Sequence, residues 1–169
     1  MTAARHERKK SQRFCGAAVA LAAIALGYGL LARVTDAATT ERIVADYRTG
    51  LAISGFDPVA YFIDAQAIVG RPEFELRHAG VTWRFRNEGN RAAFTADPQV
   101  YMPRFGGYDP VGVARGVSTA GHPELWLIAG ERLYLFYSAD GRESFAENPE
   151  RAIGAAERRW PEVLRALTP

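Results

Sequence analysis

The sequence has almost no cysteine. Cys15 is the only one among 169 residues, and it lies in an apolar stretch near the N-terminus. The chain beyond that stretch therefore has no disulfide, no thiolate metal ligand and no cysteine nucleophile. A metal bound there would need nitrogen and oxygen ligands, because the thiolates of a tight Cu(I) or tetrahedral zinc site are missing.

Lysine is also scarce, and positive charge is concentrated at the N-terminus. The formal net charge is +2, but six Arg or Lys residues and two acidic residues precede Ala37. The remainder has 15 arginines against 17 Asp and Glu, which is a net charge of −2 (15 minus 17). No stripe of basic residues interleaved with aromatic residues is present, so the sequence argues against nucleic-acid binding.

Motifs that would identify an enzyme are missing too. The chain contains no G-x-S-x-G, H-E-x-x-H, Walker or dinucleotide-binding pattern. Only His78 and His122 lie beyond the N-terminal region, and neither belongs to a motif that would make it the base of a catalytic serine. The sequence therefore predicts no catalytic residue.

One long apolar run is present, at residues 14–32, directly after a basic head. As a helix it would be about 28 Å long, close to the ~30 Å hydrocarbon core of a bilayer. A positive flank places the head in the cytoplasm and exports the rest. Residues 1–37 are predicted to be either an uncleaved anchor, which the length favours, or a signal peptide cleaved near Thr35-Asp36-Ala37.

The tripeptide Asp-Pro-Val occurs twice, at residues 57–59 and 109–111, and the similarity continues beyond it. GRPEFEL (70–76) matches GHPELWL (121–127), Ala-Gly recurs at 79–80 and 129–130, and R-x-x-F-x-x-x-P recurs at 91–98 and 142–149. The simpler explanation is that residues common in turns recur here by chance. Four ordered matches at offsets of 50 to 52 instead favour a tandem duplication, with units at about 51–102 and 106–151.

Each unit is predicted to fold as strand, turn, strand and helix. Residues 74–77 and 81–85 alternate apolar and polar side chains, as half-buried strands do, around a turn at Ala79-Gly80. Residues 125–128 and 133–137 are nearly continuous apolar runs, typical of central strands buried on both faces. The predicted helix starts are Asn87, then Ser138 or Asp140, then Asn148-Pro149, and Trp160-Pro161 is expected to interrupt the last helix.

The predicted fold class is α+β. A unit of about 50 residues buries little core by itself, so the two units are expected to pack as one small domain and to pool their strands. The expected organisation is a linker at 38–50, the duplicated domain at 51–161 and a helical tail at 162–169, all preceded by the apolar helix.

The segments GFDPVAYF and VTWRFRNEGNRAAFTADPQVYMPRFGGY resemble the YHS domain family, and in particular its members exported by bacteria. The matching stretches are Asp57–Phe62, Trp83–Phe85, Asn90–Pro98 and Tyr101–Tyr108, and the resemblance covers roughly residues 51–161. It implies a small α+β fold related to treble-clef modules, a location in the bacterial periplasm, and a metal-related role whose activity is poorly defined. The domain would be anchored in the inner membrane, or released to the periplasm if the leader is cleaved.

This chain departs from the family at its cysteine positions. Metal-binding members have Cys directly after Asp-Pro-Val, where this chain has Ala60 and Gly112, and exported members have Cys where this chain has Asp109. The family's soft-metal site is therefore not expected here.

Three residues remain as candidate ligands of a divalent metal: Asp57, Asp109 and His122. The two aspartates occupy matching positions, so they could together hold a hard cation or share a proton. The alternative is that an Asp before Pro accepts hydrogen bonds from backbone N–H groups in a turn. His122 could join Asp109 in a weak N/O site, or be an ordinary loop histidine.

A ligand pocket is the other candidate site, in the aromatic and glycine-rich segment 101–108. Gly106-Gly107 permits a close approach of the backbone to a ligand, or to the neighbouring unit. Arg104 and Arg115 could clamp an anion or carboxylate. The candidate lining residues are Tyr101, Arg104, Tyr108 and Arg115.

Two functions fit the sequence. The first is a non-enzymatic envelope binding module linked to metal handling through N/O ligands. The second is a degenerate module that has lost its metal and serves as a small-ligand or protein-interaction domain, with a partner in the envelope. An enzyme is a weaker third interpretation, because it would need a carboxylate of strongly raised pKa, for instance between Asp57 and Asp109.

Overall fold

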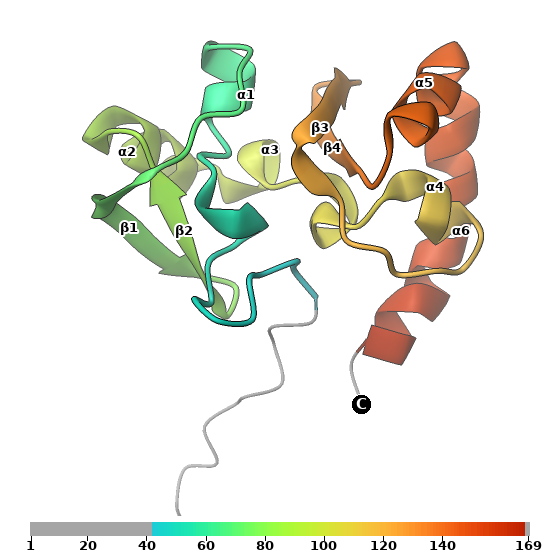
Figure 1. Ribbon diagram of the computed structural model, residues 1–169, viewed down its shortest axis with the longest axis horizontal. Coiled ribbons are helices and arrows are strands. Elements are labelled where there is room, and N and C mark those ends of the chain that lie inside the picture. Colours follow the sequence, from blue (N-terminus) through green and yellow to red (C-terminus); the bar gives the residue numbers. More distant parts are fainter. Residues whose placement is uncertain (1–41, 168–169) are drawn as a thin grey trace, which may run out of the picture. The chain divides into compact units, whose positions relative to one another are not determined.

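The structure, a computed structural model, describes residues 42–167 (Figure 1). The predicted apolar helix at 14–32 lies outside the described residues. No helix within residues 42–167 is both long enough and apolar enough to cross a membrane. The elements are the 3₁₀ helices η1 (Ile53–Gly55) and η2 (Arg104–Gly107), the strands β1 (Arg71–His78), β2 (Val81–Phe85), β3 (His122–Ala129) and β4 (Arg132–Phe136), and the helices α1 (Ala60–Ile63), α2 (Glu88–Ala96), α3 (Pro98–Tyr101), α4 (Pro110–Ala114), α5 (Ala139–Glu147) and α6 (Pro149–Leu167).

The fold is mixed α+β, with two small antiparallel sheets. Strand β1 pairs with β2, and β3 pairs with β4, so that Leu76 lies opposite Trp83 and Leu127 opposite Tyr134. Each sheet has only two strands. The expectation that the strands would be pooled in one sheet is therefore wrong.

Both hairpins close with two residues in the left-handed region. Ala79 and Gly80 have φ of 52° and 82°, and Gly130 and Glu131 have φ of 53° and 59°. Two-residue turns with positive φ match the twist of the paired strands. The predicted turn at Ala79-Gly80 is confirmed.

Strand β4 separates two hydrophobic cores, which explains its nearly continuous apolar sequence. Leu133 and Leu135 pack into the first core, whereas Tyr134 and Phe136 pack into the second. Successive side chains of a strand point to opposite faces, so β4 is buried on both faces although it is not central in a sheet. The two hairpins are therefore joined by the side chains of β4, which enter both cores, and not by hydrogen bonds between their strands.

One phenylalanine fixes each helix that follows a hairpin. The ring centroid of Phe94 lies 5.0 Å from that of Trp83 and 5.2 Å from that of Phe85. The helices begin at predicted caps: the Asn87 side chain accepts a hydrogen bond at 2.8 Å and the Ser138 hydroxyl accepts one at 3.1 Å. In helix α5 of the second half, Phe145 packs as Phe94 does in α2. Its ring centroid lies 5.0 Å from that of Tyr134 and 5.1 Å from that of Phe136.

Helix α6 is continuous from Pro149 to Leu167, with Pro161 inside it. The expected interruption at Trp160-Pro161 is wrong, and the expected boundary at residues 161 and 162 falls within the helix. Proline removes one backbone hydrogen bond. Ala156 and Val163, on either side of it, are both buried in the second core, and the Trp160 ring lies 5.5 Å from that of Phe105. Burial on both sides holds the helix together across the proline.

The folded part begins before residue 51, within the segment expected to be a linker. Ile43 is 7% exposed and belongs to the first core. The Val44 N–H donates to the Gly106 carbonyl at 2.8 Å, and the Val44 carbonyl accepts from the Ile53 N–H at 3.0 Å. Residues 43 and 44 therefore tie η1 to η2.

Candidate functional site

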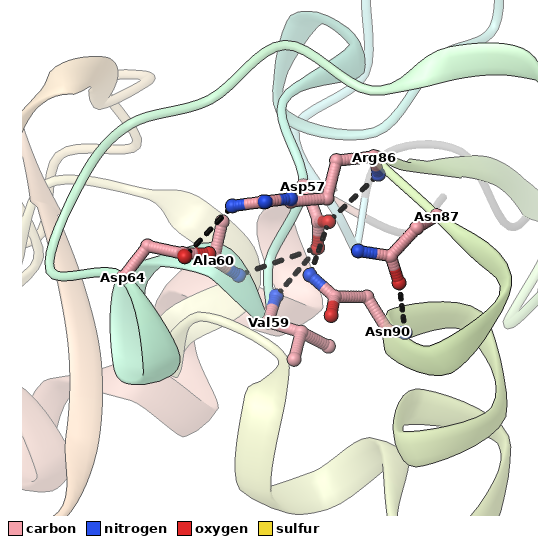
Figure 2. A network of polar contacts seen from close by, with 7 residues as sticks. All are labelled: Asp57, Val59, Ala60, Asp64, Arg86, Asn87 and Asn90. Atoms are coloured by element: carbon pink, nitrogen blue, oxygen red, sulfur yellow. Dashed lines mark hydrogen bonds and ion pairs between the residues drawn. The ribbon is translucent and has the colours of Figure 1, made fainter.

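Asp57 lies at the centre of a buried polar network (Figure 2). Its side chain is 0% exposed. One carboxylate oxygen accepts from the backbone N–H groups of Val59 at 2.8 Å and Ala60 at 3.4 Å. The other accepts from the Arg86 N–H at 2.8 Å and from the Asn90 side-chain amide at 2.7 Å. This carboxylate joins the turn before α1 to the end of β2 and the start of α2.

The four hydrogen bonds explain how a charged group is accommodated without solvent. A buried carboxylate is costly unless several donors satisfy its oxygens. Arg86 also bonds the Asp64 carboxylate through its side chain, at 2.7 Å. All described buried side-chain N and O atoms have a hydrogen-bond partner. Asp57 is thus a structural anchor, enclosed by donors of this chain.

Asp109 occupies the matching turn before α4 with fewer partners. Its carboxylate accepts from the Val111 N–H at 3.3 Å and the Gly112 N–H at 3.0 Å. Burial raises the pKa of its carboxyl above the ordinary value, against the opposing effects of backbone hydrogen bonds from Gly112, Val111 and Tyr137. The amide that Asn90 supplies to Asp57 has no counterpart, because Gly141 stands at that position of the helix.

The two histidines have different surroundings. His122 is at the start of β3 with its side chain 58% exposed, and its Nδ1 accepts from the Glu124 N–H at 3.2 Å. The His78 ring packs edge-on against Phe94, with ring centroids 5.7 Å apart. Within residues 42–167 no group of three or more His, Cys, Asp or Glu side chains is arranged to hold a metal ion.

The close approach expected at Gly106 is made to the chain itself. A Cβ atom on Gly106 would lie 1.9 Å from the Arg42 carbonyl oxygen, and φ is +63°. Only glycine can occupy this position. The close approach at Gly106 is therefore made to the backbone of Arg42 and Ile43, which lies outside the neighbouring unit expected at 51–102.

None of the cavities described within residues 42–167 is lined by all four candidate pocket residues. Arg104 lines one cavity and bonds Glu157 at 2.8 Å, whereas Tyr108 lines another and packs against Trp160 with ring centroids 6.2 Å apart. Tyr101 packs edge-on against Phe62 at 5.5 Å. Arg115 is exposed at the end of α4.

The cavity at Arg104 has a volume of about 190 Å³ and includes residues that the sequence did not indicate. Arg42 was not among the candidates because it falls in the expected linker. Gln99 and Trp83 belong to elements that are distant in sequence from Arg42, so no spacing pattern joins them. The lining residues are Arg42, Ile43, Trp83, Gln99, Met102, Pro103, Arg104, Phe105 and Gly106.

Comparison with known proteins returned no match to any family model, curated protein or solved structure.

Proposed function

We propose that this protein is a non-enzymatic binding module of YHS type that has lost metal binding and binds a small ligand. Residues 14–32 hold it at the membrane, and the folded domain faces the periplasm. The observation that carries this proposal is the role of the two Asp-Pro-Val aspartates. Both carboxylates accept backbone hydrogen bonds in their own turns, and Asp57 is fully enclosed.

Matching contacts support descent of the two halves from one duplicated unit. The Asp57 N–H donates to the Ile68 carbonyl, and the Asp109 N–H donates to the Thr119 carbonyl, both at 2.8 Å. A Cβ atom on Gly70 or Gly121 would lie 2.6 Å from Arg84 or Leu135, respectively. These positions are all 51 or 52 residues apart in the chain.

Left-handed backbone recurs in the same place in both halves. Ile53, Ser54 and Gly55 have φ of 42°, 55° and 81°, and residues 105–107 have φ of 54°, 63° and 88°. Positive φ is costly for a β-branched residue. Its repetition just before each Asp-Pro-Val is better explained by inheritance than by two independent origins.

The surroundings of Asp57 and His122, two of the candidate metal-binding residues, favour a module that has lost metal binding. A hard cation takes six or more oxygen ligands, often including waters. Asp57 has no exposed surface at which such a cation and its waters could bind. The Nδ1 atom of His122 already accepts a backbone hydrogen bond.

Metal content tests the proposed function. The full-length chain, purified in a mild detergent, is expected to contain no stoichiometric Cu, Zn, Ni, Fe or Mn by elemental analysis. Its melting temperature should not rise when these metals are added. Stoichiometric metal that is lost in the double variant Asp109→Ala, His122→Ala would overturn the proposal in favour of N/O metal handling.

A second experiment tests the location. Cell fractionation should place the full chain in the membrane fraction, with residues after 41 accessible to protease only from the periplasmic side. A mature chain that begins near Ala37 and occurs in the soluble periplasmic fraction would replace the anchor by a cleaved signal peptide.

A further inference from the structure

The cavity at Arg104 combines two arginines with apolar residues. Its lining residues include Arg42 and Arg104 and no acidic residue. Arg42 is exposed, and no ion pair or side-chain hydrogen bond joins it to another residue of the part of the chain that the structure describes. Arg104 gives one N–H to Glu157 at 2.8 Å, and a guanidinium has five N–H donors. The cavity therefore has donors suited to an anion.

Part of the cavity lining is apolar. Met102 and Phe105 supply this apolar part. Trp83 is 0% exposed and lies behind them, and its indole N–H donates to the His78 carbonyl at 3.1 Å, so it supports the wall and offers the cavity no donor. A ligand that fits both parts of the cavity has a compact apolar body and one negative group.

The walls are held in place by contacts outside the lining. The Arg132 side chain donates to the Gln99 carbonyl at 2.6 Å, and the Val44 N–H donates to the Gly106 carbonyl at 2.8 Å. A preformed site loses less conformational entropy on binding than one that must be ordered.

We propose that this cavity binds a small amphipathic carboxylate, with its carboxylate between Arg42 and Arg104 and its apolar body against Met102 and Phe105. Arginine recognises carboxylates through paired N–H donors. A cavity of about 150 Å³ is enough for a benzene ring, so a volume of about 190 Å³ accommodates one ring with its carboxylate. The inference rests on the proposed function and names the class of ligand.

Benzoate is the probe that tests this inference. Titration of the full-length chain in detergent, followed by tryptophan fluorescence and calorimetry, should give saturable binding with a dissociation constant on the order of 1 mM. Benzamide, which lacks the charge, and acetate, which lacks the ring, should each bind at least about tenfold more weakly.

Three single variants locate the binding. Arg42→Gln removes a cation that has no ion-pair partner among residues 42–167, so it should leave the melting temperature unchanged and weaken benzoate binding about fivefold or more. Arg104→Gln should weaken binding similarly, although loss of its bond to Glu157 can also lower stability. Arg115→Gln is the matched control, because this exposed arginine directly follows α4 and does not line the cavity, and the variant should bind benzoate as the parent chain does.

The outcomes separate this inference from the proposed function. Absence of saturable benzoate binding, equal affinity for benzamide, or equal binding by Arg42→Gln and Arg115→Gln would overturn the carboxylate site. Those results would not affect the proposed loss of metal binding, which depends on metal content. Stoichiometric metal would overturn the proposed function even if benzoate bound.

Discussion

Replacing Asp57 with alanine should destabilise the fold far more than the same change at Asp109. The Asp57 carboxylate accepts three short hydrogen bonds, from Val59 at 2.8 Å, Arg86 at 2.8 Å and Asn90 at 2.7 Å. Alanine would leave these three donors without their acceptor in a site with no solvent exposure.

The size of the loss follows from the number and kind of these bonds. A hydrogen bond to a charged group contributes about 1.5–3 kcal/mol to stability. Removing the carboxylate also removes its own desolvation cost, and a water molecule can fill part of the space. The net loss of unfolding free energy for Asp57→Ala is therefore about 3–5 kcal/mol.

Two other variants calibrate this loss. Asp109 has longer bonds, 3.0 Å and 3.3 Å, and is 8% exposed. Asp109→Ala should therefore cost about 1–2 kcal/mol, as loss of a helix cap does. Asp64 pairs with Arg86 at the surface, and Asp64→Ala should cost less than about 1 kcal/mol.

Urea denaturation of the full-length chain, followed by circular dichroism and tryptophan fluorescence, measures all three losses. The slope of the free energy against urea should be the same in each variant, so that midpoints report stability. If Asp57→Ala cost no more than Asp109→Ala, the assignment of Asp57 as the anchor of the first half would be refuted.

Three more predictions concern the second half of the domain and the glycines. Gly141→Asn should stabilise the protein by about 1 kcal/mol, because it supplies Asp109 with the amide that Asp57 receives from Asn90. The gain should disappear when Asp109 is also replaced by alanine. An equal gain in the Asp109→Ala background would contradict the reasoning. Gly70→Ala should lower the free energy of unfolding by more than about 2 kcal/mol, since its Cβ would lie 2.6 Å from the Arg84 backbone. Gly154→Ala, inside α6, should instead raise the free energy of unfolding by about 0.5–1 kcal/mol. Thermal melts of the two variants measure both effects. Burial raises the pKa of Asp109 above 3.8 in the folded state, so the folded state binds the proton more tightly than the unfolded state does. The stability of the parent chain relative to Asp109→Asn should therefore fall as the pH rises from below 3.8 through the folded pKa. A relative stability that rises over that interval would show the opposite shift.

The sequence predicted most local structure correctly, because local structure depends on nearby residues. Alternation of apolar and polar residues located strand β2 at 81–85, and a capping side chain located the helix start at Asn87. For the next helix the sequence left Ser138 and Asp140 open, and Ser138 is the cap. The limits of local reasoning appear at Pro161. A proline inside a helix predicts an interruption, but the buried side chains around it decide otherwise.

Contacts between distant segments could not be predicted in the same way. The apolar run in β4 correctly indicated burial on both faces, but only the tertiary structure shows that two separate cores cause it. Arg42 was expected to lie in a linker, yet it lines a cavity with Trp83 and Arg104. Such neighbours are joined by folding rather than by spacing.

The sequence by itself determined that thiolate chemistry is excluded beyond Cys15, because no other cysteine exists. It also favoured a tandem repeat, since turn and core residues recur at offsets of 50 to 52. Only the tertiary structure decided what the two aspartates do. A carboxylate before a proline can be a ligand or a cap, and the sequence is the same in both cases. At Asp57 the decision comes from Arg86 and Asn90, 29 and 33 residues away, which donate to the carboxylate and enclose it.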